Sequence, residues 1–240
     1  MRRHYILGTT ASGKTSASIS LAEMVNAPVV VLDRIQCFQE LWTVSSRPQD
    51  SELGATKRFY LDDREISHGN LGVEDAYTKL VNIVDKLSNY HSFVILEGGS
   101  VSLCRLIVER AELCRGSTVE IRWNNPDDPA YVQKIRERVV QMMEPRVDRR
   151  SIVDELKYAW DYKEQRDFIT SICGFDGILS WCDDNNFHIE DVDFECLPLS
   201  AIGEITDRVA ESHRKYARTQ FEMLNIMEQA MIATGVKVVR

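Results

Sequence analysis

Short apolar runs alternate with amphipathic segments over the first 150 residues of the chain. The apolar runs predict strands at 5–7, 29–32, 92–96 and 118–123, with a shorter strand at 59–61. Apolar residues at helical spacing predict helices at 15–25, 73–87, 101–110 and 130–143. The β-branched run at 29–32 is typical of a parallel strand that is buried on both faces. This alternation predicts an α/β fold, in which helices flank a parallel sheet.

The pattern becomes helical after residue 150. Ser151 begins a capping box that predicts the start of a helix, and a second segment with an apolar face follows at 165–172. A turn-rich stretch covers 183–198, and residues 200–233 have the pattern of one long helix or two. We therefore expect residues 1–150 to form an α/β domain and residues 151–240 a smaller helical lobe that closes a pocket over it.

The first predicted strand leads into a glycine-bounded loop, Gly8-Thr-Thr-Ala-Ser-Gly-Lys-Thr15. Its pattern, G-x-x-x-x-G-K-S/T between a strand and a helix, is that of a phosphate-binding P-loop, and a chance glycine turn is the weaker interpretation. The backbone N–H groups and the helix dipole would surround an anion, and Gly8 and Gly13 avoid a Cβ that would crowd it. Lys14 supplies a mobile cation, and the Thr15 hydroxyl is a candidate ligand for Mg²⁺. The motif leaves open which diphosphate or triphosphate is bound.

Two acids follow predicted strands, at the sheet edge where α/β proteins bind ligands. Asp33 follows the strand at 29–32, and it is either a base or ligand that faces the phosphates, or a cap of the next turn that could pair with Arg34. Glu97 follows the strand at 92–96, and it is either a second carboxylate facing Mg²⁺ or the partner of a basic residue. Position alone does not separate these interpretations.

Basic residues gather on the helix predicted at 130–143 and just beyond it. Lys134, Arg136 and Arg138 are spread around the helix, and at least one of them is expected to face the phosphates. A cluster at 146–150 contains three arginines and predicts either lid arginines or an exposed basic turn.

Composition limits the function classes. The formal net charge of −8 argues against a protein built to coat nucleic acid, because such affinity depends on Lys and Arg. No apolar run approaches the roughly 18 residues of a membrane span, and the Met-Arg-Arg start leads straight into the P-loop strand, so we expect a cytoplasmic protein. Zinc and disulfides are not expected, because the cysteines form no C-x-x-C pair; they are Cys37, Cys104, Cys114, Cys173, Cys182 and Cys196.

These stretches resemble the adenylate isopentenyltransferases, the short bacterial cytokinin-making enzymes, which are similar in turn to transfer-RNA dimethylallyltransferases. The resemblance covers the first 150 residues almost without a gap, and the rest more loosely. Beside the P-loop it is carried by Val31-Leu-Asp-Arg-Ile-Gln-Cys37, Ser45-Ser-Arg-Pro48, Ser51-Glu-Leu53, Arg58-Phe-Tyr-Leu-Asp62, Ile95-Leu-Glu-Gly-Gly-Ser100 and Arg138-Val-Val-Gln-Met142. In two places the chain departs from the family: Cys173 stands where relatives have an acid, and His213 and Tyr216 are exchanged in order.

The resemblance implies that the loop holds the diphosphate of dimethylallyl diphosphate, or of a hydroxylated analogue, with Mg²⁺ as the cofactor. The diphosphate would leave as the exocyclic amine of AMP attacks the allylic carbon. Asp33 would take the proton of the amine, and Thr10 would touch the bridging oxygen. The implied catalytic residues are Asp33, Lys14 and Thr10, and the implied substrate-binding residues are Gly8, Thr9, Ser12, Gly13, Thr15, Ser45, Gly98, Arg138, Arg146 and Cys173.

Two rival functions use the same loop. Transfer-RNA prenylation needs a surface for an anticodon stem, which an acidic chain of this length does not obviously provide. A small-molecule kinase would seat the β- and γ-phosphates of ATP in the loop, and Asp33 could serve there equally well. Only the longer family match favours prenyl transfer to AMP over the kinase.

Overall fold

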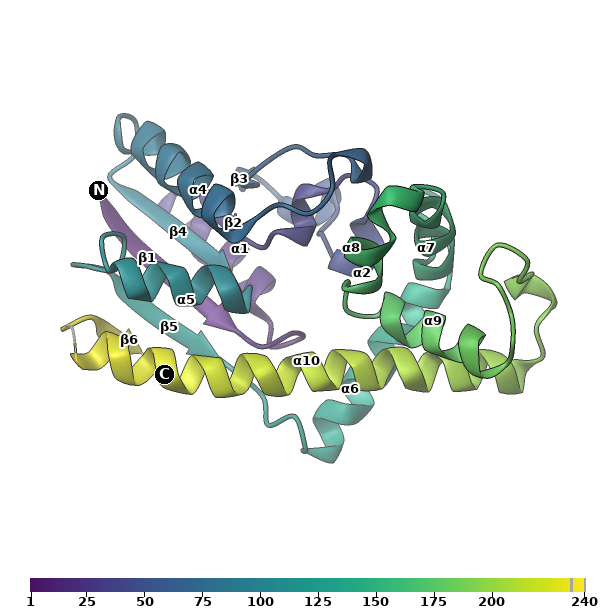
Figure 1. Cartoon of the computed structure of the whole chain (residues 1–240). Helices are drawn as coiled ribbons and strands as arrows, with labels where there is room; N and C mark the ends of the chain where they lie inside the picture. The colour runs from purple at the N-terminus through teal and green to yellow at the C-terminus, as the bar shows by residue number, and fades with distance from the viewer. Residues whose placement is uncertain (234, 240) are drawn as a thin grey trace.

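In the computed structural model, which describes residues 1–233 and 235–239, six strands form one parallel sheet (Figure 1). The strands are β1 (Arg2–Gly8), β2 (Val29–Leu32), β3 (Arg58–Phe59), β4 (Phe93–Gly98), β5 (Thr118–Arg122) and β6 (Lys237–Val239). Their order across the sheet is β3-β2-β4-β1-β5-β6. Because every pair is parallel, the carboxyl ends of all these strands lie at the same edge of the sheet.

Helices cover both faces of the sheet. The longer helices are α1 (Lys14–Val25), α4 (Val73–Ser88), α5 (Val101–Arg110), α6 (Pro129–Met143), α7 (Ile152–Trp160), α9 (Phe175–Asp184) and α10 (Leu199–Ala233). The shorter ones are α2 (Trp42–Ser45), α3 (Asp50–Leu53), α8 (Arg166–Thr170) and the 3₁₀ turns η1 (Ile35–Cys37), η2 (Ile66–His68), η3 (Lys163–Gln165) and η4 (Phe194–Cys196). Ile6 and Ile95 pack with Ala22 of α1 on one face, whereas Leu7 and Leu96 belong to the larger core that includes α4 and α5. The predicted α/β fold with a parallel sheet flanked by helices is confirmed.

The long helix α10 runs beside both halves of the molecule (Figure 1). It packs against α9 and α6 near one end and against α5, β1 and β6 near the other. The strand β6, which follows α10 and pairs with β5, was not predicted from the sequence, because its Lys-Val-Val is too short to carry a period. The predicted division into an α/β domain of residues 1–150 and a helical lobe of residues 151–240 stays a prediction.

Within the described residues, no helix is both long and apolar enough to cross a membrane.

The carboxyl ends of the central strands approach each other too closely for side chains. A Cβ on Gly8 would lie 1.9 Å from the carbonyl oxygen of Arg122 in β5. A Cβ on Gly98 would lie 2.4 Å from the carbonyl oxygen of Leu32 in β2. Both distances are far inside van der Waals contact, and the obstacle in each case is backbone that cannot rotate away. Glycine at these two positions therefore lets the neighbouring strands pair up to the edge of the sheet that supports the P-loop.

We predict that Gly98→Ala lowers the free energy of unfolding by about 3 kcal/mol or more, because the added methyl forces β2 and β4 apart. The matched control is Gly203→Ala in α10, where an added Cβ meets no atom within 4 Å. That change should instead add about 0.5–1 kcal/mol, since alanine favours a helix interior. Urea denaturation followed by circular dichroism measures both values, and equal stability of the two variants would contradict the prediction.

Candidate active site

One cavity of about 610 Å³ opens at the carboxyl ends of β1, β2 and β4. Residues of α6, α8 and α10 form its other walls. The residues predicted from the sequence that line it are Thr10, Ser12, Gly13, Lys14, Thr15, Asp33, Ser45, Gly98, Arg138 and Cys173. Three predicted residues do not line it: Gly8 and Thr9 are buried behind its wall, and Arg146 is exposed outside it.

The P-loop has the form of an anion cradle. Ala11 and Gly13 adopt positive φ angles of 53° and 81°, and Gly13 immediately precedes the first turn of α1. The N–H groups of that turn have no acceptor within the helix. Lys14 donates from Nζ to the carbonyl oxygen of Thr9 at 2.6 Å and forms no ion pair within the described chain, and burial lowers its pKa. The buried Oγ of Ser12 lacks a hydrogen-bond partner there as well. The loop therefore presents donors and a cation to a ligand that carries negative charge.

Asp33 combines both interpretations that the sequence left open. Its Oδ1 accepts hydrogen bonds from the backbone N–H groups of Ile35 and Gln36, at 2.8 and 3.3 Å, and so caps the turn η1. The same carboxyl lines the cavity, where Oδ2 has no hydrogen-bond partner among the described residues. Burial raises the pKa of Asp33. One oxygen thus fixes the side chain, and the other is left for a ligand.

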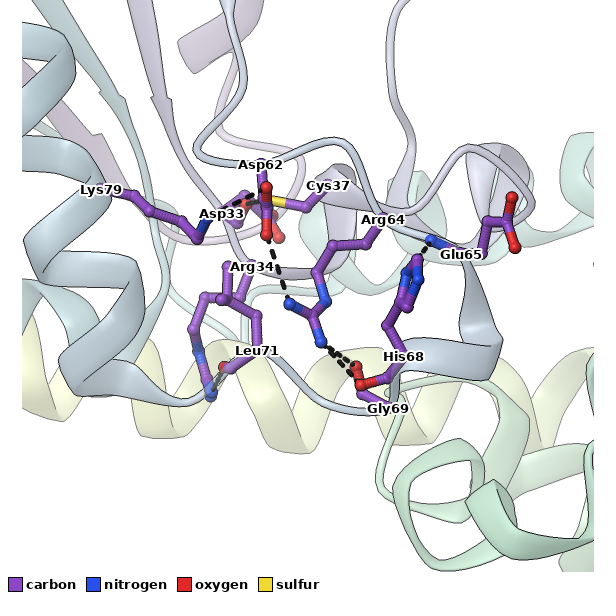
Figure 2. A network of polar contacts seen from close by, with 10 residues as sticks. All are labelled: Asp33, Arg34, Cys37, Asp62, Arg64, Glu65, His68, Gly69, Leu71 and Lys79. Carbon is purple, nitrogen blue, oxygen red and sulfur yellow. Dashed lines mark hydrogen bonds and ion pairs between the residues drawn. The ribbon is translucent and has the colours of Figure 1, made fainter.

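A polar network supports the turn that carries Asp33, as Figure 2 shows. Arg34 does not pair with Asp33; its guanidinium donates to the carbonyl oxygen of Leu71 at 2.7 Å. Arg64 bonds the Asp62 carboxylate at 3.2 Å and the carbonyl oxygen of His68 at 2.7 Å. Arg64 thus holds the segment after β3 in shape, and Arg34 bonds that segment to the turn that carries Asp33.

Glu97 has the basic partner that was the alternative to a role facing Mg²⁺. Its carboxylate forms an ion pair with Arg58 at 2.7 Å, and the side chains are only 4% and 1% exposed. Arg58 also donates to the hydroxyl of Ser18 in α1 at 3.2 Å. A buried carboxylate that is already paired with a guanidinium is costly to separate from it, so the structure favours a supporting role for Glu97.

Arg138 lines the cavity from α6, and the exposed Lys134 of the same helix lines it as well. The guanidinium of Arg138 forms no ion pair or hydrogen bond within the described residues, and burial lowers its pKa. Arg136 lies on another face of the helix and pairs with Asp207 at 2.7 Å. In the basic turn that follows, Arg149 rather than Arg146 lines the cavity. A partly buried cation without a counterion at the wall of a cavity favours an anionic ligand.

The wall around Cys173 carries no formal charge at neutral pH. The Sγ atom lies 3.4 Å from Nδ1 of His213 and 3.5 Å from the hydroxyl of Ser212. Burial raises the pKa of Cys173 to about 12 and lowers the pKa of His213 to about 4, so both side chains are neutral. The acid of this region is Asp176, which accepts from Ser212 at 2.6 Å and does not line the cavity. With Phe168 and Ile172, this wall suits an uncharged group.

A family model described as isopentenyl transferase matches residues 1–234. The chain belongs to this family. Among its relatives, the adenylate dimethylallyltransferase of Ralstonia nicotianae is 33% identical over 221 residues, which are 92% of each chain. The enzyme of the same name from Agrobacterium fabrum is 37% identical over 176 residues, which cover 73% of this chain and 72% of the relative.

Solved structures share the fold of this isopentenyl transferase family member at lower identity. A eukaryotic dimethylallyltransferase acting on tRNA superposes with a TM-score of 0.71 at 14% identity, covering 100% of this chain and 74% of that one. A tRNA isopentenylpyrophosphate transferase from Bacillus halodurans gives 0.65 at 14% identity and 98% coverage of both chains. At this identity the likeness establishes the fold alone.

Three residues of the site were not found from the sequence. Gln220 and Tyr131 bond the backbone of Thr10 from α10 and α6. Glu155 of α7 accepts from the backbone N–H of Val44 at 2.9 Å and so holds the short helix that carries Ser45. Gln220 lies seven residues beyond His213 on the buried face of α10, and a polar residue on a predicted apolar face was the available signal.

The lowered pKa of His213 predicts a pH-dependent loss of stability. The unfolded chain binds a proton at this histidine near pH 6.5, whereas the folded chain does so only near pH 4. Stability is therefore lost as the pH falls below 6.5, by about 2 kcal/mol between about pH 6.5 and 5. In His213→Gln this component should be absent. Urea denaturation of both proteins at about pH 7.5 and about pH 5 measures the difference, and parallel losses in the two would disprove it.

Proposed function

We propose that this protein transfers a dimethylallyl group from dimethylallyl diphosphate to the exocyclic amine of AMP and releases diphosphate. The observation that carries the proposal is that a P-loop cation, an open carboxylate and an unpaired arginine face one cavity: Lys14, Asp33 and Arg138. Relatives at 33% and 37% identity bear the name adenylate dimethylallyltransferase, which supports this acceptor and this donor.

The P-loop would hold the donor diphosphate. The N–H groups at the start of α1 and the ammonium of Lys14 stabilise the charge that grows on the bridging oxygen as its bond to the allylic carbon breaks. Thr10, which lines the cavity at the entrance of the loop, would lie against that oxygen. Such donors accelerate the reaction because the charge they bind is larger in the transition state than in the bound substrate.

The residues present fit Mg²⁺ as the cofactor. The described part of the chain contains no cluster of three or more His, Cys, Asp or Glu side chains that could hold a metal ion. Mg²⁺ in phosphate sites needs only one or two protein oxygens and takes the rest from phosphates and water. The Thr15 hydroxyl, which lines the cavity beside the loop, would supply such an oxygen. When bound, the ion would neutralise charge on the diphosphate.

Asp33 would act on the acceptor. As the bond between the adenine nitrogen and the allylic carbon forms, the nitrogen must lose a proton, and Oδ2 of Asp33 is free to accept it. The electron pair of the broken carbon–oxygen bond leaves with diphosphate. Arg138 would bind the phosphate of AMP or of the donor, and Ser45, which lines the same cavity, would bind the adenine or sugar.

The uncharged wall around Cys173 would border the prenyl chain.

No observation of this site favours a tRNA adenosine as the acceptor, since the tRNA enzymes share only the fold. None favours a kinase activity either. A hydroxylated donor is a variant of the same proposal, and the assay below distinguishes the two donors.

The proposal predicts that the purified protein, mixed with AMP, dimethylallyl diphosphate and Mg²⁺, forms prenylated AMP and diphosphate. Mass spectrometry detects the nucleotide product, and parallel reactions with the hydroxylated donor, with an unmodified tRNA and with ATP plus AMP complete the comparison. Phosphate transfer from ATP, or product on tRNA without product on AMP, would reject the proposal.

Asp33→Asn separates the two roles of this side chain, which are to cap the turn η1 and to accept the proton. The amide oxygen can still accept from Ile35 and Gln36, so the turn should keep its shape, but the amide cannot take a proton. We expect kcat to fall by about 10²–10⁴-fold with nearly unchanged affinity for inorganic diphosphate. Calorimetric titration checks the affinity. If the loss lay chiefly in diphosphate affinity, the role of general base would be wrong.

A further inference from the structure

We infer that Gln220 is a positioning residue that holds the phosphate-binding loop in its active conformation by clamping Thr10 to Gly99. The inference rests on the proposed function, because only there does Thr10 lie against the leaving diphosphate. It adds to that function a residue of α10, more than 200 positions away in sequence, that governs the geometry of the loop.

The side chain of Gln220 joins two segments at the carboxyl edge of the sheet. Its Oε1 accepts from the backbone N–H of Thr10 at 2.7 Å, and its Nε2 donates to the carbonyl oxygen of Gly99 at 2.8 Å. The two partners fix the orientation of the carboxamide, because an N–H group requires the oxygen and a carbonyl requires the NH₂ group. Only a neutral amide, or a protonated acid, satisfies both at once.

The packing around the clamp is tight. A Cβ on Gly99 would lie 2.5 Å from the carbonyl oxygen of Gly8 and 2.7 Å from Nε2 of Gln220. Gln220 itself is only 4% exposed. Loss of the carboxamide would remove the partner that holds the Thr10 N–H and the partner that holds the Gly99 carbonyl.

The loop needs such support. Thr10 is held from the other side too, since the hydroxyl of Tyr131 in α6 donates to its carbonyl oxygen at 3.0 Å. The next residue, Ala11, has a φ of 53°, which is unfavourable for a residue with a Cβ and persists only where the surroundings impose it. Gln220 and Tyr131 are the side chains that fix the peptide groups immediately before this strained position.

A purely structural tie between α10 and the sheet is the alternative. Gln220→Glu distinguishes the two, because a protonated glutamic acid can accept from Thr10 and donate to Gly99, whereas the carboxylate repels the Gly99 carbonyl. Burial raises the pKa of an acid at this position. The ratio of variant to wild-type turnover should therefore be near one at low pH and fall reversibly, on the order of 10- to 100-fold, as the pH rises.

Three controls accompany this variant. Gln220→Met removes both bonds and should lower turnover and the affinity for inorganic diphosphate at every pH. Gln229→Glu places the same acid on an exposed position of α10 and should match the wild type. Using the ratio to the wild type cancels the titration of the other groups that line the same cavity. These charged and titratable residues are Lys14, Asp33, Arg34, Arg47, Glu52, Glu97, Lys134, Arg138, Arg149, Cys173, His213 and Tyr216.

The measurements are prenylated AMP by mass spectrometry across the pH range and calorimetric binding of inorganic diphosphate with Mg²⁺. A pH-independent ratio for Gln220→Glu, or wild-type turnover and diphosphate affinity in Gln220→Met, would overturn the inference. If the wild type formed no product while Gln220→Met still lost diphosphate affinity, the proposed function would fail and the positioning role would stand. Should Gln220→Met not fold, Gln220→Glu alone decides, because one preparation is compared at two pH values.

Discussion

The close approach of β1, β2, β4 and β5 at their carboxyl ends is the constraint on which the site depends. Backbone meets backbone at Gly8 and Gly98, where a Cβ would lie 1.9 and 2.4 Å from carbonyl oxygens of the neighbouring strands. Because the strands are parallel, this closure gathers the P-loop after β1, Asp33 after β2 and Gly99 after β4 at one edge. The position of the cavity thus follows from the parallel order of the strands as much as from the side chains that line it.

Local sequence was enough to predict the sheet, the P-loop and the placement of Asp33, because apolar periodicity and a contiguous motif report on neighbouring residues. Contacts between segments that are far apart in the chain could not be predicted from local sequence. Glu97 has Arg58 as a partner and Gln220 holds Thr10, and neither pairing leaves a signal in spacing. The choice of Arg149 over Arg146 depends on how a tight turn faces, which a run of basic residues does not encode. The strand β6 was missed because three residues cannot show alternation.

Charge is distributed unevenly between the body and the cavity. The chain has a formal net charge of −8, yet Lys14 and Arg138 line the cavity and form no ion pair within the described residues. The charges of Glu97, which is paired with Arg58, and of Asp33 raise the pKa of Lys14, but burial outweighs them and the pKa stays lowered. An anion in the cavity would offset the remaining desolvation cost of these two cations, so the site favours phosphate or polyphosphate ligands. Burial raises the pKa of Asp33, which brings this carboxyl closer to the range of an effective proton acceptor.

The helix α10 explains how a loop that precedes residue 16 can depend on residues beyond 210. His213, Tyr216 and Gln220 fall on one face of the helix, and all three line the cavity. The helix contacts α9 and β6, and it carries both His213 of the uncharged wall and Gln220, which holds Thr10. Movement of α10 would therefore shift the wall beside Cys173 and the peptide of Thr10 at once, which couples the shape of the pocket to the geometry of the anion cradle. α10 contributes both groups, since Gln220 accepts from the Thr10 N–H and His213 lies against Cys173.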